Sequence, residues 1–223
     1  MDGEIKLEDV FAQRLALLRP TRADLRRIAQ AYRAAIVPDA KQVIAALRFA
    51  GCEVYVVSGG LLPAVQEFAR ALGLPPRNIR AVPVEFDQLA GEWWRYDRHR
   101  YGGNPDERYL AFAPTPLIET QGKRAVIAEL AGDETRTLLV GDGVTDLEAR
   151  DAVKLFVGFG GVVRRERVAA EADVFLEAQG LASVVPLALS AWRASQLIGT
   201  EHAAVLQRGW QDIQQGLVKF RKG

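Results

Sequence analysis

A regular alternation of short apolar runs with amphipathic segments, from residue 39 to residue 176, most strongly constrains how this chain can fold. The apolar runs have the length of strands, and the segments between them repeat apolar residues at helical spacing. Strands are expected at 53–58, 136–141, 154–158 and 174–176, less regular β material at 79–86 and 92–113, and helices at 39–50, 62–72, 122–131, 145–150 and from 164. This alternation is typical of βαβ units, so the sequence predicts an α/β fold with a doubly wound parallel sheet.

The N-terminal part of the chain departs from this alternation. Helices are expected at 7–17 and 21–36, and no strand is expected with them. Thr21 suits the N-cap of the second helix, and Asp24 stands three residues later in a capping-box position. We therefore expect a helical segment before the α/β part begins.

The C-terminal part is also expected to be helical, over residues 186–223, with a division at Gly199 and Thr200. Apolar residues recur through this stretch at helical spacing. Two interpretations stay open: an extra packing layer on the α/β part, or an interface through which residues 191–223 form a homodimer.

Composition limits the partners and the setting of the protein. The 223 residues carry a net charge of +1, with 49% hydrophobic and 26% charged residues, so no global field favours nucleic acid or an anionic membrane. No apolar run approaches the roughly 20 residues of a membrane helix, and the first residues do not have the pattern of a signal peptide. Cys52 is the single cysteine and cannot form an internal disulfide, so we expect a cytoplasmic location.

The run LVGDGVTD at residues 139–146 is the strongest functional signal. An apolar strand ends in Gly-Asp-Gly, which places Asp142 at the carboxyl end of a strand, where parallel sheets bind ligands. Carboxylates suit a hard cation such as Mg²⁺, so Asp142 is predicted to be a metal ligand. Asp146 follows with Thr145 on the next turn. Asp146 is interpreted as a second ligand, as a residue behind the ligands or as a simple N-cap.

Three further segments could bind an anionic substrate. Ser58 ends an expected strand and precedes Gly59 and Gly60, so a hydroxyl and free backbone amides could receive a phosphate, although Ser-Gly-Gly also occurs in turns without a ligand. Lys123 opens an expected helix, where a cation opposes the helix dipole unless a phosphate or carboxylates compensate it; a solvated surface lysine is the alternative. Arg14 lies on the polar side of the first helix. It is either solvated or bound to a substrate carboxylate.

An aromatic and basic stretch at 93–101 has the composition of a nucleic-acid surface. An amphipathic hairpin is the preferred interpretation, because residues 109–112 could pair with it across a Gly-Gly-Asn-Pro turn. His99 is then a surface residue. The small net charge gives nucleic-acid binding little electrostatic basis.

Taken together, these segments resemble motifs of the haloacid dehalogenase superfamily and, within it, of the phosphoserine phosphatases. The likeness runs from Met1 to about Pro186. It rests on the segments VVSGG at 56–60, GK at 122–123, GDGVTD at 141–146 and FVGFGG at 156–161, together with MDGE at the start and RLALL at 14–18.

The resemblance implies a Rossmann-like doubly wound sheet with a helical cap. Residues 1–37 would be a remnant of that cap, 38–190 the α/β core with a β flap near 79–116, and 191–223 a C-terminal helical extension. The implied activity is Mg²⁺-dependent hydrolysis of O-phosphoserine to serine and phosphate, within serine biosynthesis.

The resemblance also implies a role for each matched residue. Arg14 would hold the substrate carboxylate, and Ser58 with Gly59 and Thr145 would bind the phosphoryl group. Lys123 would be catalytic, because it neutralises the nucleophile and the phosphate. Asp142, together with Asp146, would hold Mg²⁺. The partner implied is therefore a small phosphorylated molecule, with no nucleic acid and no membrane.

The chain departs from the family pattern in three places. Leu7 stands where the family has a phenylalanine in the cap pocket, and the segment after residue 86 is longer than usual, which predicts a remodelled flap. The first motif, Asp-x-Asp-x-Thr, is absent, and no Asp-x-Asp occurs anywhere in the chain, so no nucleophile is found. Covalent phosphoryl transfer needs such a group beside the metal.

The absent motif would bring the first strand of the fold, which lies between the strands ending at Ser58 and Asp142. Without it, those strands face a gap or pair with each other. Because Met1 is the only methionine and matches a position inside the family's cap, we expect the gene product or its ancestor to extend upstream. A non-catalytic relative that binds a phosphorylated ligand or a partner is the alternative.

Overall fold

The computed structural model describes residues 7–89, 94, 104–132 and 136–221. It has a mixed α/β architecture with parallel strands, as predicted. The chain divides into two compact units. Unit 1 spans Met1–Ala35, Val56–Ala71 and Pro75–Lys123, and unit 2 spans Ile36–Tyr55, Leu72–Leu74 and Arg124–Gly223. None of the described helices combines the length and the apolar character that a membrane crossing requires.

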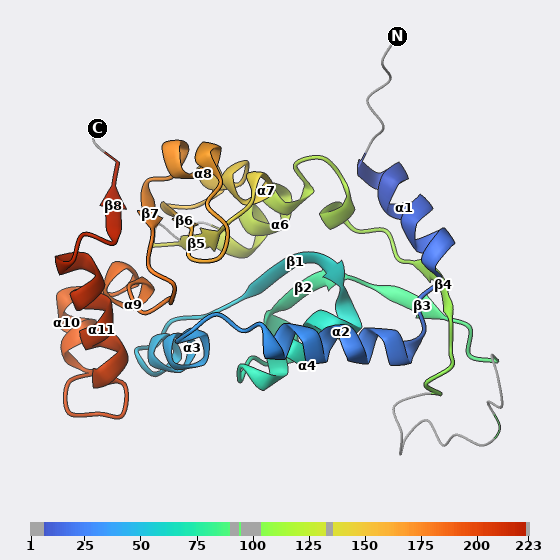
Figure 1. The fold of residues 1–223 in the computed structure, drawn as a ribbon, viewed down its shortest axis with the longest axis horizontal. Helices are drawn as coiled ribbons and strands as arrows, with labels where there is room; N and C mark the ends of the chain where they lie inside the picture. The colour runs from blue at the N-terminus through green and yellow to red at the C-terminus, as the bar shows by residue number, and fades with distance from the viewer. Residues whose placement is uncertain (1–6, 90–93, 95–103, 133–135, 222–223) are drawn as a thin grey trace, which may run out of the picture. The chain divides into compact units, whose positions relative to one another are not determined.

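Unit 1 joins two N-terminal helices to two small pairs of strands (Figure 1). Its elements are α1 (Leu7–Leu18), α2 (Arg22–Ala34), β1 (Val56–Leu61), α4 (Leu62–Ala71), the 3₁₀ turn η1 (Pro76–Asn78), β2 (Ile79–Val82), β3 (Val84–Phe86), β4 (Tyr109–Phe112) and the 3₁₀ turn η3 (Pro116–Ile118). Strands β1 and β2 are parallel, and β3 and β4 are antiparallel.

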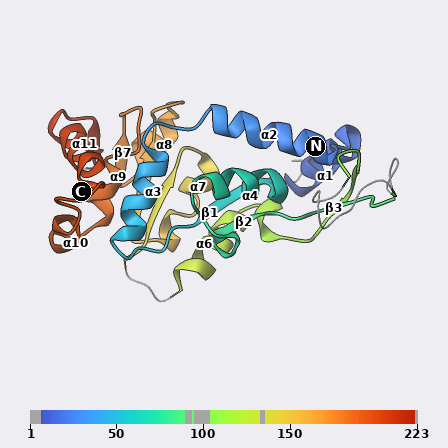
Figure 2. The same ribbon diagram turned by 90° about the horizontal axis from the view of Figure 1, so that it is seen from below.

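The core of unit 1 lies where α2 packs along α4, an arrangement visible in Figure 2. Leu25 and Ala29 of α2, Ala64 of α4 and Phe86 of β3 are buried together there. The predicted capping box of α2 is confirmed: Thr21 Oγ1 accepts the Asp24 N–H at 3.1 Å, and Asp24 Oδ2 accepts the Thr21 N–H at 2.9 Å.

Several predicted strands of unit 1 have different bounds or partners. Strand β1 covers Val56–Leu61 rather than 53–58, so the two glycines lie inside the strand and not in a turn after it. Pro83 divides the predicted segment 79–86 between two sheets. Strand β4 pairs with β3. Its predicted pairing with 93–101 stays a prediction, because most of that stretch, including His99, lies outside the described residues.

Unit 2 contains a four-stranded sheet in the order β5-β6-β7-β8, with helices around it. Its elements are α3 (Ala40–Phe49), α6 (Gly122–Ala131, from Arg124 onward), β5 (Leu138–Gly141), α7 (Val144–Leu147), the 3₁₀ turn η4 (Arg150–Ala152), β6 (Leu155–Phe159), α8 (Glu166–Glu171), β7 (Val174–Leu176), α9 (Val184–Ala188), α10 (Ala191–Ser195), α11 (Ala203–Gln214) and β8 (Val218–Phe220). Strands β5, β6 and β7 are parallel, whereas β8 runs antiparallel to β7.

The main core of unit 2 lies between this sheet and α3, α9 and α11. Val43 of α3, Val157 of β6, Val185 of α9 and Val205 of α11 belong to one buried cluster. The prediction of helix throughout 186–223 is wrong at the end, because β8 adds an antiparallel strand to the sheet. The predicted division of the helices at Gly199 is confirmed: this glycine has a φ of +80° between α10 and α11.

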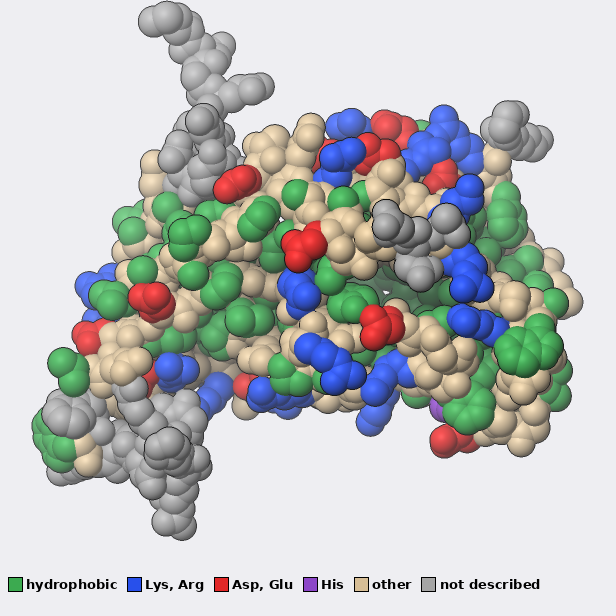
Figure 3. Space-filling model, turned by 180° about the vertical axis from the view of Figure 1, so that it is seen from behind, with side chains coloured by type: hydrophobic (Ala, Val, Ile, Leu, Met, Phe, Trp, Pro, Cys, Tyr) green, Lys and Arg blue, Asp and Glu red, His purple; other side chains and the backbone are tan. Residues whose placement is uncertain are grey.

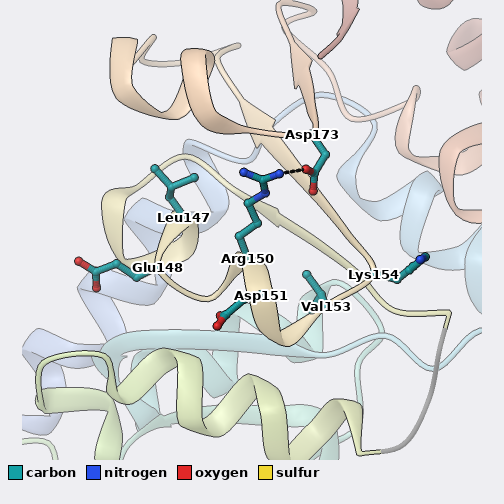
Figure 4. A pocket seen from close by; sticks show the side chains of 7 residues that line it. All are labelled: Leu147, Glu148, Arg150, Asp151, Val153, Lys154 and Asp173. Carbon is teal, nitrogen blue, oxygen red and sulfur yellow. Dashed lines mark hydrogen bonds and ion pairs between the residues drawn. The ribbon is translucent and has the colours of Figure 1, made fainter. Parts of the chain in front are cut away.

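A hollow of about 500 Å³ in unit 2 lies at the amino ends of β6 and β7 (Figure 4). Arg150 and Asp173 form an ion pair within it, and Asp173 Oδ2 also accepts the Phe156 N–H at 2.9 Å. Arg150 donates a second bond to the Glu171 carbonyl at 2.9 Å. Because parallel sheets bind ligands at the carboxyl ends of their strands, we interpret this hollow as a structural clasp.

The two strands that carry the predicted motifs are both edge strands within the described residues. Strand β1 pairs with β2 alone, and β5 pairs with β6 alone, so direct pairing of β1 with β5 is not observed there. The apolar residues of both strands are only half-buried. The outer side of each edge strand therefore carries backbone N–H and C=O groups that no described strand pairs with.

Candidate functional site

The loop after β5 is folded tightly around Asp146. Asp146 Oδ2 accepts the Gly143 N–H at 3.1 Å, and the residue is only 8% exposed. A Cβ on Gly141 would lie 2.3 Å from Cβ and Cγ of Asp146, so only glycine fits at the end of the strand. The prediction of Asp146 as a simple N-cap is wrong, because Gly143 is the N-cap of α7 and Asp146 is the third helical residue, whose carboxylate accepts the N-cap N–H. A role of Asp146 as metal ligand stays a prediction.

Asp142 has a more open environment on the same loop. Its side chain is 51% exposed and accepts a bond from Arg165 Nη2 at 3.2 Å. Thr145 is exposed on the first turn of α7. The loop therefore presents one accessible carboxylate and one accessible hydroxyl beside the carboxyl end of β5.

Ser58 lies in an irregular part of β1. The pairing with β2 shifts register between Val57 and Leu61, so the ladder is interrupted around Ser58. Ser58 Oγ accepts the Gly60 N–H at 3.0 Å. A hydroxyl can donate its own hydrogen while it accepts, so Ser58 can still offer a donor to a ligand.

A pocket of about 250 Å³ in unit 1 brings two of the predicted site residues together. Four elements line it: Phe11, Arg14 and Leu15 from α1, Ile28 and Tyr32 from α2, Gly59, Gly60 and Leu61 from β1, and Ala64 from α4. The structure thus places Arg14 and the glycines after Ser58 at one cavity, although these residues are far apart in the sequence.

Two aromatic residues of this pocket were not among the predicted site residues. Phe11 follows Leu7 by one helical turn and supplies an aromatic ring to the pocket; the Leu7 side chain lies outside the described residues. A Cβ on Gly60 would lie 3.6 Å from the Tyr32 hydroxyl, so this hydroxyl lies close to β1. The sequence signal for Tyr32 was weak, because a tyrosine on an amphipathic helix is usually a packing residue.

Lys123 is the second residue of α6 and is half-buried. The helix begins against η3, since a Cβ on Gly122 would lie 1.5 Å from the Pro116 carbonyl oxygen. This contact fixes where the helix starts within unit 1. Lys123 is the last residue of unit 1, whereas Asp142 belongs to unit 2. That Ser58, Lys123 and Asp142 lie together in one site therefore stays a prediction.

The donors on the β5 loop have the chemistry that Mg²⁺ prefers. Asp142 and Asp146 supply hard carboxylate oxygens, and Mg²⁺ is commonly held by one or two carboxylates together with waters and substrate phosphate. Among the described residues, no cluster of three or more His, Cys, Asp or Glu side chains could hold a metal ion. The two acids therefore fit a Mg²⁺ site that relies on substrate and water for its other ligands.

Comparison with protein families assigns most of this chain. Residues 6–150 match the model of the haloacid dehalogenase-like hydrolases. This range includes the pocket of unit 1 as well as the loop after β5, so the match covers both groups of candidate site residues.

Individual proteins agree with the family match. The chain is 30% identical over 179 residues to a phosphoserine phosphatase of Drosophila melanogaster, which covers 79% of this chain and 60% of that protein. It is 29% identical to a phosphoserine phosphatase of Mus musculus, over 75% of this chain and 68% of that protein. The chain thus spans about three fifths of the fly protein.

A solved structure supports the fold. A phosphoserine phosphohydrolase-like protein from Francisella tularensis superposes with a TM-score of 0.64, over 85% of this chain and 80% of that one. The two sequences are 22% identical, so this likeness concerns the fold alone.

Proposed function

Because the chain belongs to the haloacid dehalogenase-like hydrolases, we propose that it serves the Mg²⁺-dependent hydrolysis of a small phosphomonoester, with O-phosphoserine as substrate. The choice of substrate is supported by relatives that carry the name phosphoserine phosphatase. A cytoplasmic location and a place in serine biosynthesis belong to the same proposal.

The pocket of unit 1 is the observation that carries this proposal. Phosphoserine has a carboxylate at one end and a phosphate at the other. Arg14 would offer a guanidinium fork for the carboxylate. The Gly59 backbone and the Ser58 hydroxyl, which keeps its own hydrogen while it accepts the Gly60 N–H, would offer donors for the phosphate. The apolar lining from Phe11 and its neighbours would exclude water from these contacts, which strengthens them.

The loop of unit 2 would supply the metal site. Asp142 would hold Mg²⁺ directly, and Asp146 would either join it or keep the loop in shape from behind. When bound, Mg²⁺ would stabilise negative charge on the phosphoryl oxygens. Lys123 would add a positive charge to the same phosphoryl group, and the Thr145 hydroxyl would add a donor.

The sequence limits what these residues can do by themselves. The reaction needs a carboxylate that attacks phosphorus and a second one that transfers protons, and no Asp-x-Asp occurs in the 223 residues. We therefore expect the isolated chain to bind phosphoserine but to hydrolyse it far more slowly than enzymes usually do.

The test is calorimetric titration with phosphoserine and with phosphoethanolamine, which lacks the carboxylate. Arg14→Ala should weaken phosphoserine binding by roughly tenfold, since a charge-assisted hydrogen bond is worth about 1.5–3 kcal/mol, and it should leave phosphoethanolamine binding unchanged. Arg70→Ala, on the exposed last turn of α4, is the matched control. Equal loss for both ligands would contradict the assignment of Arg14.

The absence of Asp-x-Asp also favours a second candidate function, a non-catalytic relative that binds a phosphorylated ligand or a partner. The coding sequence upstream of Met1 separates the two. An in-frame Asp-x-Asp-x-Thr would support the hydrolase, whereas a stop codon directly before Met1, together with binding that gives no turnover, would support the binding protein.

A homodimer through residues 191–223 stays a proposal. Figure 3 shows hydrophobic side chains at the surface of the molecule, and Trp192 and Ile198, at 70% and 71% exposure, are among the exposed hydrophobic residues of the C-terminal extension. Light scattering of the purified chain, with Trp192→Ser as comparison, would measure whether this segment holds two copies together.

A further inference from the structure

Arg165 contacts the candidate metal ligand Asp142 from the segment between β6 and α8. Its Nη2 lies 3.2 Å from Asp142 Oδ2, although 23 positions separate the two residues. Asp142 directly follows β5, and Arg165 belongs to the loop after β6, which pairs with β5 in parallel register. Two adjacent strands thus bring opposite charges together at their carboxyl ends.

The arginines on either side of Arg165 have different partners. Arg164 bonds Glu166 and Glu177, at 2.9 and 2.8 Å, and Arg167 bonds Glu171 at 3.1 Å. Both therefore pair with glutamates of α8 or of the segment after β7. In this group of three arginines, Arg165 alone is recorded in contact with a residue of the candidate site.

Formation of α8 does not explain why position 165 is an arginine. It is the N-cap residue of α8, where Ser, Thr, Asp and Asn are preferred. A cation there also opposes the helix dipole. The contact with Asp142 is thus the favourable interaction that the structure records for this side chain.

We propose that Arg165 is a positioning residue that holds the Asp142 carboxylate in the metal-free protein and competes with the divalent cation for it. This inference rests on the proposed function, because it takes Asp142 as the Mg²⁺ ligand. The side chains are 45% and 51% exposed, so the pair can open at little cost when the cation arrives. Mg²⁺ binding would then release the guanidinium of Arg165 next to the site.

The experiment is calorimetric titration of the full 223-residue chain with MgCl₂, without substrate and without an activity readout. Arg165→Ala should bind Mg²⁺ about two- to fivefold more tightly than the unchanged protein, the size expected for loss of an exposed ion pair. Arg165→Lys should give a smaller gain, since it keeps the charge but loses the planar fork. The gain should shrink at high NaCl concentration, because salt screens exposed pairs.

Matched controls separate this effect from a general change in charge or folding. Arg164→Ala and Arg167→Ala remove the same charge close by and should change Mg²⁺ affinity less than Arg165→Ala does. Thermal unfolding checks that each variant is folded. Equal Mg²⁺ affinity in Arg165→Ala and the unchanged protein, with binding abolished by Asp142→Asn, would overturn the inference while the metal site stands. Binding that Asp142→Asn does not weaken, or no binding in any variant, would overturn the metal site and the inference with it.

Discussion

Unit 1 and unit 2 build their candidate sites in different ways. In unit 1, the pocket draws side chains from α1, α2, β1 and α4. In unit 2, the candidate residues Asp142, Thr145 and Asp146 follow one another on the loop after β5 and the first turns of α7, and Arg165 contacts Asp142 from another segment. The pocket of unit 1 thus depends on how helices pack, whereas the shape of the loop after β5 depends mainly on local backbone geometry. Substitutions at the glycines and the caps of each unit can test this difference.

The largest effect is expected at the start of α6, where packing of the backbone leaves no space. A Cβ on Gly122 would lie 1.5 Å from the Pro116 carbonyl oxygen, so Gly122→Ala must push η3 away from the helix. We expect a loss of about 3 kcal/mol in the free energy of unfolding, measured by urea denaturation. Gly59→Ala, with its nearest atom at 3.7 Å, is the stability control in the same unit. Similar losses for both variants would show that packing at Gly122 is not what fixes the helix start.

A smaller loss is expected in the loop of unit 2. Gly141→Ala would place a methyl group 2.3 Å from the Asp146 side chain, which can move only by giving up its bond to the Gly143 N–H. We expect a loss of about 2 kcal/mol in urea denaturation, together with weaker Mg²⁺ binding. A Cβ on Gly143 would lie 3.3 Å from its nearest neighbouring atom, so Gly143→Ala should lower the free energy of unfolding much less. If Gly141→Ala left Mg²⁺ affinity unchanged, the shape of the loop would not matter for the metal.

The smallest effect is expected at the capping box of α2, which helps to hold one wall of the pocket. Bonds from the Thr21 backbone and side chain lower the pKa of Asp24 below its ordinary value. Because the folded-state pKa is the lower one, the stability from Asp24 is present above the unfolded-state pKa and is lost as the pH falls through the folded-state pKa.

Asp24→Ala should therefore cost about 0.5–1 kcal/mol near neutral pH, a value kept small because the side chain is partly exposed. The difference from the unchanged protein should disappear in acid, as urea denaturation at several pH values would show. Glu129→Ala, which removes an exposed carboxylate from α6, is the control. A difference that stayed constant with pH would mean that the ionised capping bond is not its source.

The elements that the sequence predicted best are those with strong local signals. The helix at 122–131 has the predicted bounds, and the capping box at Thr21 is present. Strands β6 and β7 lie within one residue of the predicted ranges. The spacing of apolar residues and the cap residues act over a few neighbouring positions, so both signals can be recognised in the sequence without knowledge of the fold.

The sequence predicted whether a segment forms a helix or a strand better than it predicted which strand a segment pairs with. The pairing of Tyr109–Phe112 with β3 was not expected, and Val218–Phe220 forms a strand where helix was expected. In both places a short apolar segment has no strong preference of its own. Its conformation depends on which sheet edge lies nearby, and that is a property of the whole unit.

The sequence by itself determined the family and the α/β class, because glycines and acids at strand ends impose local geometry that few folds share. It also predicted which residues would bind metal and phosphate. Only the tertiary structure decided that Arg14 and Gly59 share a pocket with Tyr32, and that Arg165 bonds Asp142. Such contacts join residues distant in sequence. They are set by helix packing and sheet order, which no spacing of residues along the chain encodes.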